Sequence, residues 1–140
     1  MPQYPNHKEC QFFGFCGNTY TAKIVDVYDG DTVTALFDPF PNSPFSKYYK
    51  FKIRMNRYNS AEIKPPKNIE NREQIIDLAH NSRNKLREMI LNKEIKLVCH
   101  EFDKYGRILC DIYNDDVHIN QYMIDNGFGK PYDGHGQKDF

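Results

Sequence analysis

Two aspartates on either side of a glycine, Asp29 and Asp31 around Gly30, have a spacing that suggests chemistry. In an extended segment, side chains at positions i and i+2 project from the same side, so both carboxylates can approach one ligand. Hard divalent cations prefer oxygen ligands, so the pair predicts a candidate metal site. Aspartate and glycine are also common in turns for conformational reasons alone, and an ordinary turn is the more frequent explanation of such a segment.

Three further polar features could serve the same chemistry, although each is ordinary when taken alone. Arg54 ends an alternating segment, Glu62 lies in a region without periodicity, and residues 103–107 read Asp-Lys-Tyr-Gly-Arg. A surface arginine, a solvated glutamate and a hairpin turn are the usual interpretations of such residues. Any case for a site therefore depends on the fold bringing them together.

Hydrophobic periodicity indicates the elements that must position these residues. Alternating apolar residues predict strands, and apolar residues at helical spacing predict helices. The predicted order is strands over 19–27, 32–37 and 47–55, a helix over 71–91, strands over 94–102 and 107–113, and a helix over 119–126. Five short strands with a helix between the third and fourth are the layout of the OB-fold, a five-stranded Greek-key barrel. We expect this α+β barrel with helices, although an open α+β sheet has the same pattern.

The third predicted strand has a charged face. Over residues 47–55, Lys50, Lys52 and Arg54 alternate with apolar residues. We expect the apolar face to be buried and the three cations to lie on the outer face.

The ends of the two predicted helices carry local signals. Asn71 and Gln74 have the spacing of a capping box at the start of the long helix. Gly127 follows the second helix and is a natural stop, because glycine adopts the left-handed conformation that often ends helices.

Length and charge bound the architecture and the partners. The 140 residues are enough for one domain, and residues 1–18, which lack periodicity, are interpreted as an extension of a domain over 19–140. The formal net charge is zero, but residues 47–93 carry 12 basic and 5 acidic side chains, a net +7. Such a segment can attract a polyanion, although a solvated helix face explains it equally well.

Membrane and secreted classes are disfavoured. No apolar run approaches the ~20 residues of a membrane helix, and the first residues lack the features of a secretory signal. Cys99 and Cys110 lie in apolar segments and are expected to be buried. His7, Cys10 and Cys16 could together bind a metal ion. Their spacing matches no zinc signature, so free thiols are favoured. We expect an intracellular monomer without a membrane partner.

The histidines show no catalytic pattern. His80 falls within the long predicted helix, His100 at a strand end and His118 at a helix start. We expect each of them to be structural or exposed. No Ser/His/Asp spacing suggests a hydrolase triad, and no glycine-rich loop suggests a nucleotide cradle.

Three motifs in a fixed order are more specific than any of these features alone. Asp-Gly-Asp-Thr (29–32) precedes Arg-Met-Asn-Arg-Tyr-Asn-Ser-Ala-Glu (54–62), and Asp-Lys-Tyr-Gly-Arg (103–107) follows. In this order, and on this order of strands, the sequence resembles the staphylococcal nuclease (thermonuclease-like) family over about residues 19–132. The resemblance implies an OB-fold barrel and a nuclease that hydrolyses phosphodiester bonds with little base specificity.

The resemblance implies three catalytic residues. Arg54 and Arg107 would hold the scissile phosphate, and Glu62 would position or deprotonate the attacking water. The chemistry requires such a set, because a phosphodiester repels hydroxide until its charge is neutralised and a water is activated. Two planar guanidiniums can grip phosphate oxygens as negative charge accumulates.

The resemblance also implies calcium as the cofactor. Asp31 would be a direct ligand and Asp29 would act through water. Asn59 falls where the family has a second aspartate ligand, and Ser60 where a backbone carbonyl reaches the metal. Because Asn59 replaces an anionic ligand with a neutral one, we expect weaker calcium affinity than in a site with two aspartates.

The expected partner is DNA or RNA. The resemblance implies that Lys104 and Tyr105 contact a phosphate next to the scissile one. The basic middle of the chain, including Lys50 and Lys52, is expected to guide the polyanion, and tyrosines such as Tyr132 are available to stack on bases.

Two other positions depart from the family pattern. Ala61 stands where proline is usual, and Arg57 stands where many members have glycine. Asp31, Arg54, Glu62 and Arg107 are all retained, so we expect an active enzyme. The alternatives are a binding module that keeps the fold without catalysis, and an OB-fold that binds single strands without metal; the second does not explain the acidic turn.

Overall fold

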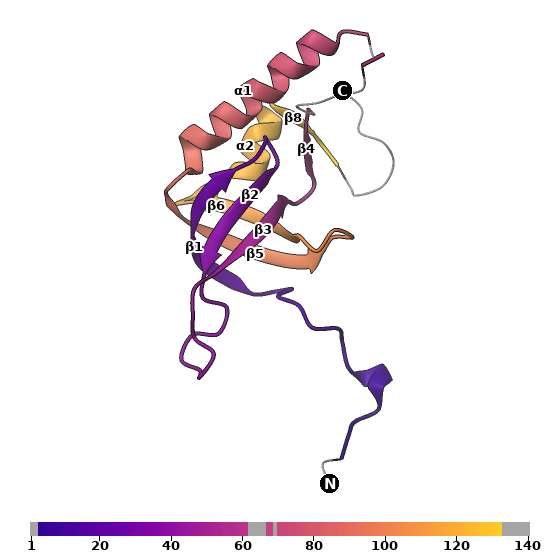
Figure 1. Ribbon diagram of the computed structural model, residues 1–140, viewed down its shortest axis with the longest axis vertical. Helices are drawn as coiled ribbons and strands as arrows, with labels where there is room; N and C mark the ends of the chain where they lie inside the picture. Colours follow the sequence, from indigo (N-terminus) through magenta and orange to yellow (C-terminus); the bar gives the residue numbers. More distant parts are fainter. Residues whose placement is uncertain (1–2, 62–66, 69, 133–140) are drawn as a thin grey trace.

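The five strands predicted from alternation are present and close into a barrel (Figure 1). The computed structural model describes residues 3–61, 67–68 and 70–132. The barrel strands are β1 (Thr19–Val27), β2 (Thr32–Phe37), β3 (Tyr49–Met55), β5 (Glu94–Phe102) and β6 (Ile108–Asn114). Antiparallel pairing follows the order β3-β2-β1-β5-β6, and a parallel β3–β6 pairing closes it. The OB-fold prediction is confirmed, and the open-sheet alternative is wrong.

Alternation along the strands fills the barrel interior. Ile24, Ile53, Leu97 and Ile112, from β1, β3, β5 and β6, are all fully buried. Because successive side chains of a strand point to opposite faces, each strand contributes one apolar row to a common core. Cys99 and Cys110 lie opposite each other in this core as free thiols, as expected for small apolar residues.

Two helices pack against the barrel. α1 spans Arg72–Ile90 and α2 spans Ile119–Asp125, close to the predicted ranges. Gly127 adopts a φ of 77° after α2, which confirms the predicted stop. The predicted capping box is wrong, because Asn71 is left-handed (φ 52°) and its side chain makes no capping hydrogen bond. An N-cap side chain reaches the first turn from an extended backbone, and a left-handed backbone turns it away.

Short strands not predicted from the sequence complete the fold. β4 (Tyr58–Ser60) pairs with β8 (Gly129–Pro131), and β7 (Val117–His118) extends the barrel sheet beside β6. The β1–β2 turn, α2 and the β4–β8 pair lie at one end of the barrel, while the β2–β3 loop lies at the other (Figure 1). Glu62 lies outside the described residues.

The N-terminal segment is only partly separate from the barrel. Residues 3–13 are exposed and include a short 3-10 helix, His7–Glu9. Phe15 is buried and contacts the rings of Phe37 and Phe51, with centroids 6.4 and 5.6 Å away. No helix in the described residues has the length and apolar character to cross a membrane.

Candidate active site

The β1–β2 turn presses two aspartates against β4. A Cβ atom on Gly30 would lie only 2.7 Å from the Cβ of Ser60 and 2.8 Å from that of Ser82, so only glycine allows this close approach. The Asp29 carboxylate accepts a hydrogen bond from the Asp31 amide at 3.0 Å. The turn residues therefore hold Asp31 in one place, between α1 and the strands.

The Asp31 carboxylate is buried and heavily hydrogen-bonded. Its side chain is only 3% exposed, and one oxygen accepts from the amide and the hydroxyl of Ser60 at 3.0 and 3.1 Å. The Thr32 hydroxyl donates to the other oxygen at 3.0 Å. A buried carboxylate needs such donors and a countercharge, because burial removes the water that stabilises it.

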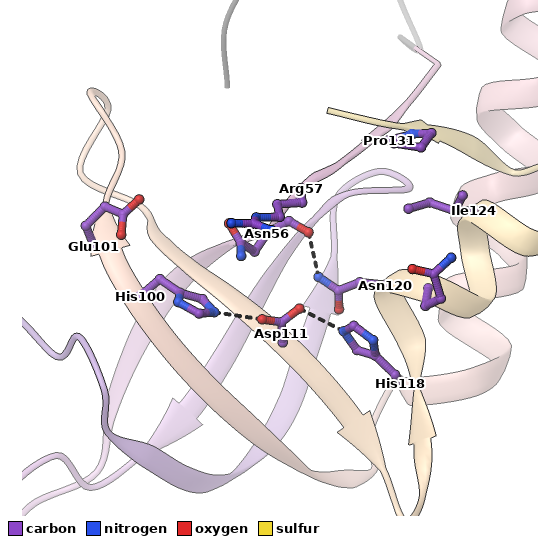
Figure 2. Close-up of a pocket in the computed structure, with 10 residues that line it drawn as sticks. Asn56, Arg57, His100, Glu101, Asp111, His118, Asn120, Ile124 and Pro131 are labelled. Carbon is purple, nitrogen blue, oxygen red and sulfur yellow. Dashed lines mark hydrogen bonds and ion pairs between the residues drawn. The ribbon is translucent and has the colours of Figure 1, made fainter. Parts of the chain in front are cut away.

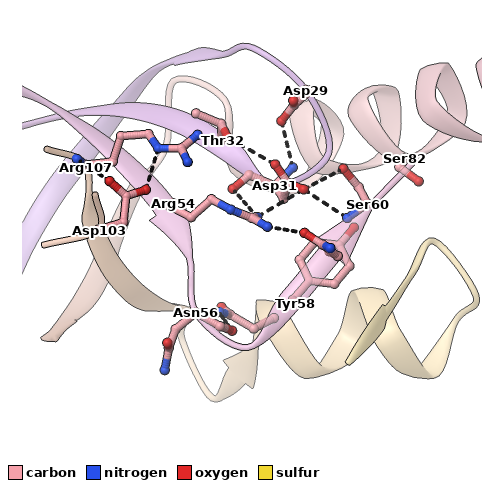
Figure 3. Close-up of polar contacts among 12 residues, drawn as sticks. Asp29, Asp31, Thr32, Arg54, Asn56, Tyr58, Ser60, Ser82, Asp103 and Arg107 are labelled. Carbon is pink, nitrogen blue, oxygen red and sulfur yellow. Dashed lines mark hydrogen bonds and ion pairs between the residues drawn. The ribbon is translucent and has the colours of Figure 1, made fainter. Parts of the chain in front are cut away.

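Arg54 supplies the countercharge. Its guanidinium lies 3.0 Å from the Asp31 carboxylate (Figure 3). It also donates a hydrogen bond to the side-chain oxygen of Asn59. Arg54 was predicted to lie on the outer face of the strand with Lys50 and Lys52, and this prediction is wrong because Arg54 is buried. Arg54 is only 7% exposed, because the β1–β2 turn and β4 cover the end of β3.

The turn between β5 and β6 positions the second arginine. The Asp103 carboxylate accepts hydrogen bonds from the amides of Tyr105 and Arg107 at 2.9 Å each, and lies 2.6 Å from Nε of Arg107. Burial opposes ionisation of Asp103, but the Arg107 and Tyr105 hydrogen bonds outweigh it and hold the pKa of that carboxyl below its usual value. Lys104 and Arg107 both lie over the Tyr105 ring, at 5.1 and 5.2 Å.

One pocket of about 720 Å³ brings most of the predicted site residues together. Its lining includes Asp29, Asp31, Arg54, Asn59, Lys104, Tyr105, Arg107 and Tyr132. Ser60 joins them through its hydrogen bonds to Asp31. Lys50 and Lys52 are exposed on β3 and do not line the pocket. The pocket thus combines a buried carboxylate, two guanidiniums and an exposed aromatic ring.

The donor chemistry of the pocket suits a hard cation. Carboxylates from Asp29 and Asp31 and the side-chain oxygen of Asn59 are the kind of ligands that calcium takes. In this arrangement Arg54 already contacts the oxygens of both Asp31 and Asn59. Among the described residues, which do not include Glu62, no three His, Cys, Asp or Glu side chains gather as a metal cluster. A cation held by Asp31 and Asn59 would compete with Arg54 for their oxygens.

Structure reveals supporting residues that the sequence analysis missed. Tyr58 is fully buried, and its hydroxyl donates to the Phe128 carbonyl at 3.4 Å. Burial raises the pKa of Tyr58, and the nearby carboxylates of Asp31 and Asp29 raise it further, so the phenol stays neutral. The alternation Tyr58-Asn59-Ser60 is too short to predict a strand, and its partner β8 lies about 70 residues further along the chain.

Comparison with known proteins relates most of this chain to one protein family. Residues 52–139 match the family described as Staphylococcal nuclease homologue. Two probable staphylococcal-like nucleases of Oryza sativa subsp. japonica, CAN3 and CAN2, are 32% and 30% identical to this chain over 87 residues. Each alignment covers 60% of this chain but only 20% and 21% of the relative, respectively. The chain thus spans about a fifth of the length of the curated relatives it matches.

Proposed function

Because this chain belongs to the staphylococcal nuclease family, we propose that it is a calcium-dependent nuclease that hydrolyses phosphodiester bonds in DNA and RNA with little base specificity. The observation that carries the proposal is the convergence of Asp31, Arg54 and Arg107 on one pocket from three separate parts of the chain. A hydrolase acting on a phosphodiester needs these two kinds of group, an acidic metal ligand and cations that neutralise the phosphate.

Different residues hold the two arginines in place. Arg107 is oriented by Asp103, so its guanidinium is fixed before substrate arrives. Arg54 pairs with Asp31, and in the proposed reaction it would donate some of its hydrogen bonds to the scissile phosphate instead. Lys104 and Tyr105, on the exposed turn beside Arg107, would hold the neighbouring phosphate. Glu62 would position or deprotonate the attacking water.

Calcium would be held by Asp31 and the Asn59 side-chain oxygen, with Asp29 acting through water and the Ser60 carbonyl completing the site. When bound, it would neutralise phosphate charge and lower the pKa of a water molecule. The protein's own contribution is to keep Asp31 fixed, through the two Ser60 hydrogen bonds and the tight approach of Gly30.

A non-catalytic module that binds nucleic acid or protein is the second candidate. Two observations favour it: Asn59 is neutral, and Arg54 contacts the oxygens of both Asp31 and Asn59. The test is to incubate the protein with single-stranded DNA in millimolar calcium or in chelator. Cleavage that requires calcium supports the nuclease, whereas binding without cleavage under either condition supports the module.

Replacing Asn59 with aspartate is expected to tighten calcium binding by about tenfold, because the added charge strengthens an oxygen-ligand site. Asn59 is 2% exposed and nearly isosteric with aspartate, so the introduced carboxylate would occupy the position of the Asn59 side-chain amide. Calorimetric titration of wild type and Asn59→Asp measures the change. The matched control is Asn56→Asp, which adds the same charge to the lining of the same pocket. Equal or weaker affinity in Asn59→Asp would show that residue 59 is not a ligand.

A further inference from the structure

A second pocket, of about 640 Å³, adjoins the candidate active site. Asn56, Arg57 and Glu101 line both pockets, so the two pockets lie side by side and share these residues as a common rim. His100, Asp111 and His118 form the floor of the second pocket, beneath the turn that carries Asn56 and Arg57 (Figure 2). A volume of this size is typical of small-ligand sites and can accept one nucleotide.

The floor is a row of three side chains from adjacent strands. His100 on β5 and His118 on β7 each lie 2.7 Å, through Nε2, from a different oxygen of Asp111 on β6. An ionised carboxylate can only accept hydrogen bonds, so both imidazoles donate to it. The His118 ring also stacks on Tyr113 at 4.7 Å. Both Asp111 oxygens are therefore engaged by histidines, which reduces the repulsion that a bare carboxylate would exert on an anion.

Arg57 stands between the two pockets on a fixed backbone. Its carbonyl accepts a hydrogen bond from the Tyr132 amide at 3.0 Å, and the Asn56 carbonyl accepts from the Asn120 side chain at 3.0 Å. Arg57 has a φ of 56°, a conformation in which glycine is less strained. Its side chain is exposed, and in the described part of the chain no carboxylate lies within ion-pair distance of it. An exposed, unpaired guanidinium on a rigid turn is well placed to bind a phosphate.

We propose that the second pocket binds the nucleotide next to the cleaved phosphodiester, on the side away from Lys104 and Tyr105. Arg57 would bind the phosphate of that nucleotide. The inference rests on the proposed nuclease function. Lys104 and Tyr105 line only the first pocket, while Arg57 lines both. A nucleic-acid strand would thus run from Lys104, past Arg54 and Arg107, and over Arg57 into the second pocket. Among the described residues, Glu101 is the one acidic residue that lines both pockets.

Binding of fluorescent oligothymidylates, measured by anisotropy in chelator, tests the proposal without requiring cleavage. Arg57→Gly is expected to weaken binding of a twelve-nucleotide strand by about tenfold, because a phosphate contact is lost. The slope of log affinity against log salt should fall by about 0.7, the share of one phosphate on a single strand.

Two controls separate a phosphate contact from a structural effect. Arg57→Lys keeps the charge and should retain most of the salt dependence, and Lys23→Ala, on an exposed β1 position outside both pockets, should leave binding unchanged. Glycine suits the positive φ, so Arg57→Gly should melt at the wild-type temperature or above. Unchanged affinity and salt slope in Arg57→Gly would overturn the proposal. Weakened binding supports the pocket even if calcium produces no cleavage, an outcome that would instead contradict the nuclease function.

Discussion

Replacing Arg107 with alanine is expected to slow calcium-dependent cleavage of single-stranded DNA by about 100-fold or more, the usual effect of removing a preorganised transition-state donor. The Asp103 carboxylate lies 2.6 Å from Nε of Arg107 and orients its guanidinium at the edge of the pocket (Figure 3). The group can therefore meet negative charge as it develops on the phosphate without first reorganising. The measurement is the single-turnover rate with saturating substrate and calcium.

A charge-conserving variant separates orientation from charge. Arg107→Lys keeps a cation but loses the planar fork, so most of the rate should still be lost. Folding is checked by melting temperature across pH. The pKa of Asp103 is lower in the folded protein than in the unfolded chain, so its ionised carboxylate stabilises the fold at pH values above the unfolded-state pKa. This stabilisation is lost as the pH falls through the folded-state pKa. Any destabilisation of Arg107→Ala should therefore shrink in acid. Equal trace activity of wild type and Arg107→Ala would contradict the proposal that this protein is a nuclease.

Replacing Arg54 with methionine is expected to destabilise the metal-free protein by about 3–5 kcal/mol, the usual result of breaking one side of a buried ion pair. The Arg54 and Asp31 side chains are 9% and 3% exposed and lie 3.0 Å apart. Without the guanidinium, the Asp31 carboxylate would keep the Ser60 hydrogen bonds but would lose its countercharge in a site with little water. Urea unfolding in chelator measures the loss.

A double variant tests the physical cause. Removing both charges, with Arg54→Met and Asp31→Asn together, should restore a large part of the lost stability, because no unpaired charge remains buried. Calcium should raise the stability of Arg54→Met more than that of wild type, since Arg54 no longer competes for the oxygens of Asp31 and Asn59. A loss below about 1 kcal/mol in Arg54→Met would place the pair in an effectively solvated environment.

Local patterns determined most of the fold. The alternation in 19–27, 32–37 and 94–102 predicted β1, β2 and β5 with the bounds that the structure has. These strands are long enough for a period of two to be distinct, and buried residues alternate with more exposed ones along most of each strand, so pattern and burial agree. The Asp-Gly-Asp-Thr turn was also predictable as a turn, since aspartate and glycine are typical of such sites.

The sequence analysis missed strands that are too short for an alternating pattern to be recognised. Three residues form β4, and their backbone is paired with β8, from Tyr58 with Pro131 to Ser60 with Gly129. No local signal distinguishes such a segment from a loop, because the pairing partner is distant in sequence. The capping box failed for a related reason: the Asn71–Gln74 spacing is compatible with a cap, but the backbone that enters α1 has a left-handed conformation at Asn71.

The residue types of the candidate site were evident from the sequence, because three ordered motifs placed Asp31, Arg54 and Arg107 on turns and strand ends of a barrel. Tertiary structure alone decided that Arg54 is buried against Asp31 and Asn59 instead of facing solvent with Lys50 and Lys52. Alternation specifies which side of a strand a residue faces. It does not specify whether another element covers that side, and here the β1–β2 turn and β4 do so.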